Sequence, residues 1–77
     1  MSVRPVKHSV TLRGHRTSIS LEDEFWQELR DLAQEMDMPI NALVAQIDAE
    51  RGVEAGLASA IRVYVLRALR ERLPSRG

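Results

Sequence analysis

Apolar and polar side chains alternate over residues 8–21, with the period of two that a strand gives to its two faces. Val10 and Leu12 alternate with polar neighbours in the first half of this stretch, and Ile19 and Leu21 do so in the second half. The pattern therefore predicts a strand region over residues 8–21 with one apolar and one polar face.

Two arrangements of this strand region are compatible with the sequence. In the first, Gly14 and His15 are the central residues of a two-residue hairpin turn, because glycine suits the first central position of such a turn. Val10 then lies opposite Ile19, and the apolar face is continuous. In the second, residues 16–21 form one main strand, and the residues before them form a looser arm.

Three stretches with helical spacing of apolar side chains follow the strand region. Ser20 and the acidic residues after it predict the start of a first helix over 22–36, since a hydroxyl cap and negative charge suit a helix N-terminus. Pro39 interrupts the helical pattern, and a new apolar face predicts a second helix over 40–50. A broad apolar side predicts a third helix over 57–72.

These elements predict a mainly α fold with a short N-terminal β segment, in a single domain over residues 1–77. Residues 1–7 and 74–77 lie outside the elements and are expected to be flexible. A lone strand or hairpin exposes unpaired backbone groups and is not stable in water, so its simplest partner is the same strand of a second copy. The sequence thus predicts a homodimer that is joined by an intersubunit antiparallel β-ribbon.

The composition is that of a globular protein, because 44% of the residues are hydrophobic and 29% are charged. Cysteine is absent, which excludes disulfide bonds, thiolate nucleophiles and cysteine-based zinc sites. No apolar run approaches the roughly 20 residues that cross a bilayer, and no signal-peptide pattern opens the sequence. A soluble, cytoplasmic protein is expected.

The formal net charge is zero, but positive and negative residues occupy different parts of the chain. Residues 1–20 contain four cations and no acid, residues 21–54 contain ten acids and two arginines, and residues 55–77 contain five arginines and one acid. A basic N-terminal part beside an acidic middle indicates an anionic partner for the basic part. The charges alone equally fit an acidic helix surface that faces water.

The residues that could carry chemistry do not form a predicted catalytic or metal site. His8 and His15 have no acid or cysteine close in sequence that would complete a metal site. Arg62 falls on the apolar side of the third predicted helix, where a charge needs a partner. Asp48 and Glu50 are the nearest acids on the second predicted helix that could pair with it.

A strand with small polar residues, a helix, a tight turn and a second helix follow one another over residues 16–50. This order resembles the ribbon-helix-helix family of dimeric DNA-binding proteins, the class of the Arc and MetJ repressors. Three runs are similar to a bacterial branch of the family with a third helix: His15-Arg-Thr-Ser-Ile-Ser-Leu-Glu, Asn41-Ala-Leu-Val and Leu57-Ala-Ser-Ala-Ile-Arg. With that helix, the resemblance covers residues 16–70.

The resemblance implies where DNA would be contacted, since in the family a two-stranded ribbon enters the major groove and the second helix binds a phosphate through its first amides. The side chains implied to contact bases are those of Arg16, Ser18 and Ser20. The backbone amides implied to contact phosphate are those of Ile40, Asn41 and Ala42. Lys7 and Arg13 of the basic N-terminal part can neutralise further phosphates, or belong to an arm that contacts nothing.

The resemblance further implies a sequence-specific DNA-binding protein, either a homodimeric transcriptional regulator or an antitoxin-like autorepressor. No enzymatic activity, cofactor or metal is expected. The alternative is a dimeric protein-interaction module that keeps the fold without binding DNA. Its partner would contact the acidic first helix or the basic third helix, and the serines at two of the three outward strand positions favour this alternative.

Overall fold

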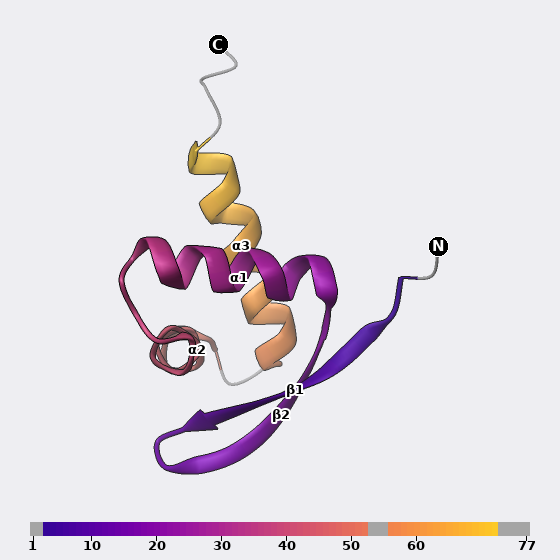
Figure 1. Cartoon of the computed structure of the whole chain (residues 1–77), viewed down its shortest axis with the longest axis vertical. Helices are drawn as coiled ribbons and strands as arrows, with labels where there is room; N and C mark the ends of the chain where they lie inside the picture. Colours follow the sequence, from indigo (N-terminus) through magenta and orange to yellow (C-terminus); the bar gives the residue numbers. More distant parts are fainter. Residues whose placement is uncertain (1–2, 53–55, 73–77) are drawn as a thin grey trace.

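The computed structural model describes residues 3–52 and 56–72 of the chain. Two strands are followed by three helices (Figure 1), which are β1 (Pro5–Leu12), β2 (His15–Glu22), α1 (Asp23–Glu35), α2 (Ile40–Glu50) and α3 (Leu57–Arg72). The order confirms the predicted class, a short β segment before a mainly α fold. Of the ends expected to be flexible, residues 5–7 instead belong to β1, while 1–2 and 74–77 lie outside the described residues.

β1 and β2 form an antiparallel hairpin with a two-residue turn, in which Leu12 lies opposite His15. The central residues are Arg13 and Gly14, with φ angles of 52° and 81°. Two positive φ values define the type I′ turn, whose twist matches that of the strands and which accepts glycine at its second position. The prediction that Gly14 and His15 form the turn is therefore wrong by one residue.

The shifted turn changes the partners of the strands but keeps their faces. Val10 lies opposite Thr17, and the predicted pairing of Val10 with Ile19 is wrong by two residues. Because side chains alternate with a period of two, a shift of two residues leaves the same side chains on the same face. Val10 and Ile19 thus still point to the core, where both are buried.

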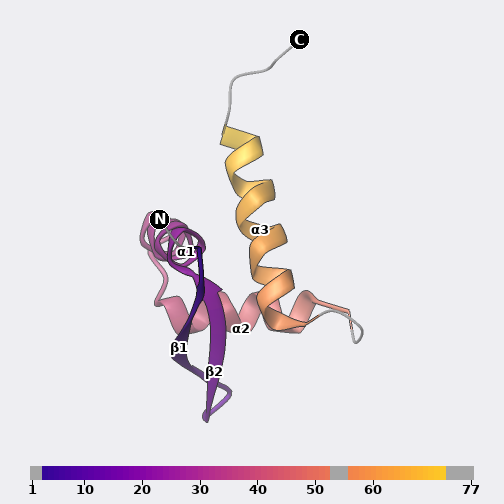
Figure 2. The same cartoon turned by 90° about the vertical axis from the view of Figure 1, so that its right-hand side faces the viewer.

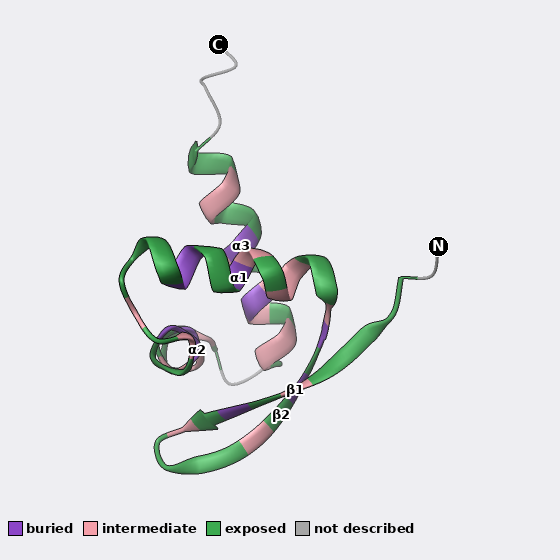
Figure 3. Ribbon diagram, viewed as in Figure 1, coloured by how far each residue is buried: buried purple, intermediate pink, exposed green. Residues whose placement is uncertain are grey.

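The core lies where the inner face of the hairpin meets the three helices, and all five elements contribute buried residues to it (Figure 3). Its fully buried side chains are Leu21, Leu29, Leu43, Val44, Ile61 and Val65. Within the chain, β1 pairs with one edge of β2, and the other edge of β2 has no strand partner among the described residues, so the intersubunit ribbon stays a prediction. One chain therefore encloses an apolar core of its own.

The two ends of α1 are formed differently. At its C-terminus, Met38 N–H donates to the Ala33 carbonyl at 2.9 Å, and Asp37, with φ of 57°, donates to the Gln34 carbonyl at 3.0 Å. This pair of bonds is a Schellman motif, which ends the helix. At its N-terminus, no side chain caps the helix, and Ser20 lies within β2, so the predicted serine cap is wrong.

Arg62 connects α3 to the junction between β2 and α1. Its Nε and Nη2 atoms both lie 2.8 Å from Oε1 of Glu22, and its guanidinium lies 5.8 Å from the centre of the Phe25 ring. The predicted partners Asp48 and Glu50 are wrong, because the packing of α3 against α1 and β2 brings Arg62 to a residue 40 positions away. The Glu22 backbone N–H and the Arg62 guanidinium lower the pKa of the Glu22 carboxyl.

α3 packs against the core through one side, and its C-terminal turns extend beyond the other elements (Figure 2). Ile61 and Val65 are buried in the core, whereas Val63 and Leu66 are exposed. Arg72 at the end of the helix forms an ion pair with Glu35 of α1. Among the described residues, no helix is both long and apolar enough to cross a membrane.

Candidate nucleic-acid interface

The three predicted base-contacting residues share the outer face of β2. Arg16, Ser18 and Ser20 are exposed, since they alternate with residues that point toward the helices. Among those inward residues, Ile19 is 3% exposed and Leu21 is fully buried. Because the inner face is buried, the outer face points to solvent and is accessible to a ligand.

β1 adds a second row of polar side chains to this face. Lys7 lies opposite Ser20, Ser9 opposite Ser18, and Thr11 opposite Arg16. All three β1 residues are exposed. Lys7, predicted on a basic arm, is thus part of a strand and stands next to a predicted base-contacting residue.

The three cross-strand pairs are of the type that brings side chains close together. The Thr11 N–H donates to Oδ1 of Asn41 at 3.1 Å and is directed away from β2. In an antiparallel pair, residues whose amides point away from the partner strand form the non-hydrogen-bonded sites, where opposite Cα atoms are about 4.5 Å apart. Lys7 and Ser9 follow Thr11 with the period of two and occupy equivalent sites. The outer face is therefore a compact surface two side chains wide.

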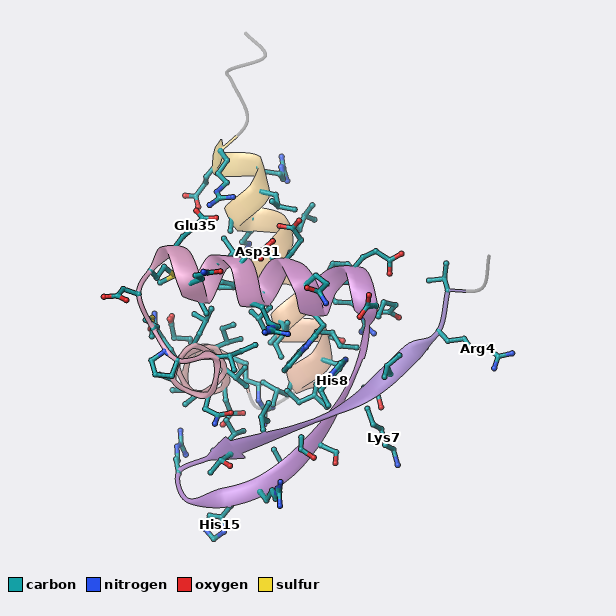
Figure 4. All side chains as sticks on the ribbon, viewed as in Figure 1. Arg4, Lys7, His8, His15, Asp31 and Glu35 are labelled. Atoms are coloured by element: carbon teal, nitrogen blue, oxygen red, sulfur yellow. The ribbon has the colours of Figure 1, made fainter. Side chains whose placement is uncertain are left out.

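The hairpin carries most of the positive charge of this end of the molecule. Arg4, Lys7, Arg13 and Arg16 belong to it or lie just before it, and Glu22 is the first acid of the sequence and is paired with Arg62. In Figure 4, Arg4, Lys7 and His15 extend from the hairpin, while Asp31 and Glu35 lie on α1, above the hairpin in the view. Asp31 and Glu35 thus do not cover the cationic surface of the hairpin.

The N-terminus of α2 lies against the edge of β1 through the bond between Asn41 and Thr11. The first amides of a helix lack partners within the helix and can bind an anion. Of the three predicted phosphate-contacting amides, that of Ala42 donates to the Pro39 carbonyl at 3.0 Å. The amides of Ile40 and Asn41 are the better candidates at this end.

A surface pocket that Ile40 helps to line has mixed charge. Arg30 lines it together with Asp31 and Asp37, so its charge does not favour an anion as the hairpin does. On the β1 side of the α2 N-terminus, Thr11 bonds to Asn41, and the cation Arg16 lies opposite Thr11 on β2.

The histidines do not come together as a metal site. The His8 ring is stacked on Trp26, with 4.0 Å between the ring centres and 9° between the planes. His15 lies at the turn end of β2. Within residues 3–52 and 56–72, no group of three or more histidines or acids could hold a metal ion.

Sequence reasoning placed Ser9 and Thr11 among the polar residues of the strand region but did not name them as candidate site residues. Their alternation with Val10 was visible, but their place depends on whether residues 8–13 pair with the main strand. The signal that could have found them is Gly14, which also suits the second position of a type I′ turn.

A two-stranded antiparallel ribbon, with a polar and cationic outer face and helices behind it, is the arrangement found in proteins that bind DNA through a β-ribbon. The family model of the ribbon-helix-helix domain matches residues 5–69, and the chain belongs to this family. The match includes β1 as well as β2. Members of the family are generally DNA-binding transcription regulators and typically form dimers. No curated protein and no solved structure matches the chain.

Proposed function

We propose that the chain is a sequence-specific DNA-binding protein that acts as a homodimeric transcriptional regulator. The observation that carries the proposal is the exposed outer face of the hairpin, on which Arg16 stands with Ser18 and Ser20, while Glu22 at the end of β2 is paired with Arg62. A two-stranded ribbon fits the major groove of DNA, which is about 12 Å wide. The outer face would lie against the base edges.

The residues of this face have distinct roles in the proposal. Arg16 can donate two parallel hydrogen bonds to O6 and N7 of a guanine, which no other base pair accepts in the same way. Ser18 and Ser20 can each donate or accept one hydrogen bond, which discriminates less between bases. Specificity in β2 would therefore come mainly from Arg16.

Phosphate contacts would fix the ribbon in the groove. Lys7 and Arg13 lie at the two ends of the outer face, where charged side chains can reach the backbones that border the groove. The amides of Ile40 and Asn41 would bind a phosphate next to β1, because the α2 N-terminus is joined to Thr11. These contacts would raise affinity for every sequence alike.

Regulation needs binding only. A protein that occupies its site excludes other proteins from it, so the same interface serves a transcriptional regulator or an antitoxin-like autorepressor. No side chain of the outer face is required to act as an acid, a base or a nucleophile.

The proposal is tested by titrating the purified protein against fluorescent genomic DNA fragments at two salt concentrations and measuring anisotropy. We expect binding that weakens steeply with salt and that differs between fragments. Binding without fragment preference would contradict sequence specificity. Absence of binding at low salt would overturn the proposal and favour a protein-interaction module.

A further inference from the structure

We infer that, in the DNA-bound dimer, β1 is the outer strand of the sheet and that Ser9 and Thr11 bind the sugar–phosphate backbone at the rim of the major groove. The inference rests on the proposed DNA binding and divides the contacts of the outer face between its two strands. Base contacts stay with the outward side chains of β2, and β1 binds the DNA backbone that borders the groove.

The first argument is the order of the strands when two chains meet. β1 occupies one edge of β2, and the other edge of β2 has no strand partner among the described residues. An open edge carries unpaired backbone groups, and the same strand of a second copy pairs with it about a twofold axis. The resulting sheet has the two β2 strands at its centre and one β1 strand on each outer side.

The second argument is the width of this sheet compared with the width of the groove. Neighbouring strands are roughly 4.8 Å apart, so the two central β2 strands fit within a major groove of about 12 Å. Each β1 strand then lies roughly 7 Å from the twofold axis, which is more than half the groove width. β1 therefore lies above the sugar–phosphate backbones and not above the base edges.

The third argument is the size and chemistry of the side chains that β1 presents. Ser9 and Thr11 are exposed on the outer face, opposite Ser18 and Arg16 of β2. Short side chains let the DNA backbone approach β1 closely, and a hydroxyl group can donate a hydrogen bond to a phosphate oxygen. Arg16, the long side chain of the central strand, can still reach a base edge when the sheet rests on the rims of the groove.

The fourth argument is the outer edge of β1. The Thr11 N–H points away from β2 and donates to Oδ1 of Asn41 at 3.1 Å. The N–H groups of Lys7 and Ser9 point the same way, because these residues follow Thr11 with the period of two. Outward N–H groups and hydroxyl groups thus form a row of hydrogen-bond donors that leads to the α2 N-terminus. Successive phosphates of one DNA strand can be bound along this row.

The experiment separates contacts to the DNA backbone from contacts to bases. Ser9→Ala and Thr11→Val each remove one hydroxyl group, and Thr11→Val keeps the branched shape of the side chain and the backbone bond to Asn41. Ser59→Ala, the same change at an exposed serine of α3, is the matched control. Each variant is titrated by anisotropy against the best genomic fragment and against duplexes with single base-pair changes, at several salt concentrations. Circular dichroism checks that each variant is folded, and sedimentation counts the chains on each bound duplex.

We expect Ser9→Ala and Thr11→Val each to weaken binding to every duplex about fivefold, because a hydroxyl contact to phosphate is lost whatever the base sequence. The order of preference among the duplexes should stay that of the wild type. The salt dependence should also stay the same, since a neutral hydroxyl group displaces no counterion. The control should bind like the wild type, with two chains on each bound duplex.

Two results would overturn the inference while sequence-specific binding stands. Unchanged affinity in either variant would mean that its hydroxyl group does not contact the DNA. Loss of preference at one base pair would place Ser9 or Thr11 over a base. A single chain on each bound duplex would contradict both the strand order and the proposed homodimer. If the wild type binds no DNA even at low salt, the proposed function fails and the inference fails with it.

Discussion

Arg16 is the residue on which the proposed specificity depends most. Arg16→Ala should weaken binding to the best fragment by about 1–3 kcal/mol and flatten the preference at one base pair, because a bidentate contact to guanine is lost. Anisotropy titrations against duplexes with single base-pair changes measure both effects. Arg16→Lys keeps the charge but not the planar fork, so it should restore affinity for unrelated DNA without restoring the preference. Unchanged affinity for the best fragment in Arg16→Ala would count against base contact by the ribbon.

At position 13, the residue that favours the stability of the turn differs from the residue that favours DNA binding. Its φ of 52° is unfavourable for a long side chain, whereas asparagine tolerates this conformation and favours type I′ turns. Arg13→Asn should therefore raise the free energy of unfolding by about 0.5–1 kcal/mol, measured by urea denaturation.

The same change should weaken DNA binding at all sequences and make the salt dependence shallower by about one unit, since one phosphate contact is lost. Arg4→Asn is the control, because it removes a charge from the same end of the sequence outside the turn. It should weaken binding without raising stability. Equal stability of Arg13→Asn and wild type would mean that the turn is not strained at this residue.

At the scale of the elements, the Glu22–Arg62 ion pair connects α3 to the end of β2. The contribution of this ion pair to the free energy of unfolding should depend on pH. The pKa of Glu22 is lowered in the folded protein by its own backbone N–H and by Arg62. A carboxyl whose folded pKa lies below its unfolded pKa stabilises the fold fully above the unfolded value and loses this effect as pH falls through the folded value. Glu22→Gln should thus be less stable than wild type at neutral pH, and the difference should disappear in acid.

Urea denaturation of both proteins from neutral to acidic pH provides the measurement. Glu24→Gln removes a neighbouring exposed carboxylate of the first turn of α1 and serves as the matched control. A difference between Glu22→Gln and wild type that stays constant with pH would show that the Glu22–Arg62 pair does not depend on the charge of Glu22.

The elements differ in how far the sequence predicts them. α2 and α3 span residues 40–50 and 57–72, as predicted, because the spacing of apolar residues, Pro39 and the joint with two glycines define them locally. The hairpin register was not determined locally. Gly14 suits the first position of one turn type and the second position of another, and the two registers differ by two residues, so both bury the same face.

Contacts between distant elements explain the remaining differences at the candidate site. Glu22 and Arg62 are 40 residues apart, and only the packing of α3 against β2 and α1 brings them together. The bond from Thr11 to Asn41 likewise joins residues 30 apart and cannot be inferred from either local pattern. The outward position of Arg16, Ser18 and Ser20, by contrast, follows directly from the alternation within their own strand.

At the scale of the whole molecule, the hairpin leaves one edge of β2 without a strand partner among the described residues. Members of the family typically form dimers, and a second copy that pairs with this edge would join two chains whose cores each form from their own five elements.

The chain should therefore fold without a second copy. Its buried apolar residues come from all five elements of one chain, and β1 already pairs with β2. When folding requires association, the midpoint of thermal unfolding rises with protein concentration, whereas a monomeric core gives a constant midpoint. We expect circular dichroism to give the same midpoint over about a hundredfold range of concentration, with sedimentation reporting the oligomeric state over that range. Ile19→Asp, which places a charge in the core, should unfold the chain at every concentration. A midpoint that rises with concentration would show instead that a second chain completes the core.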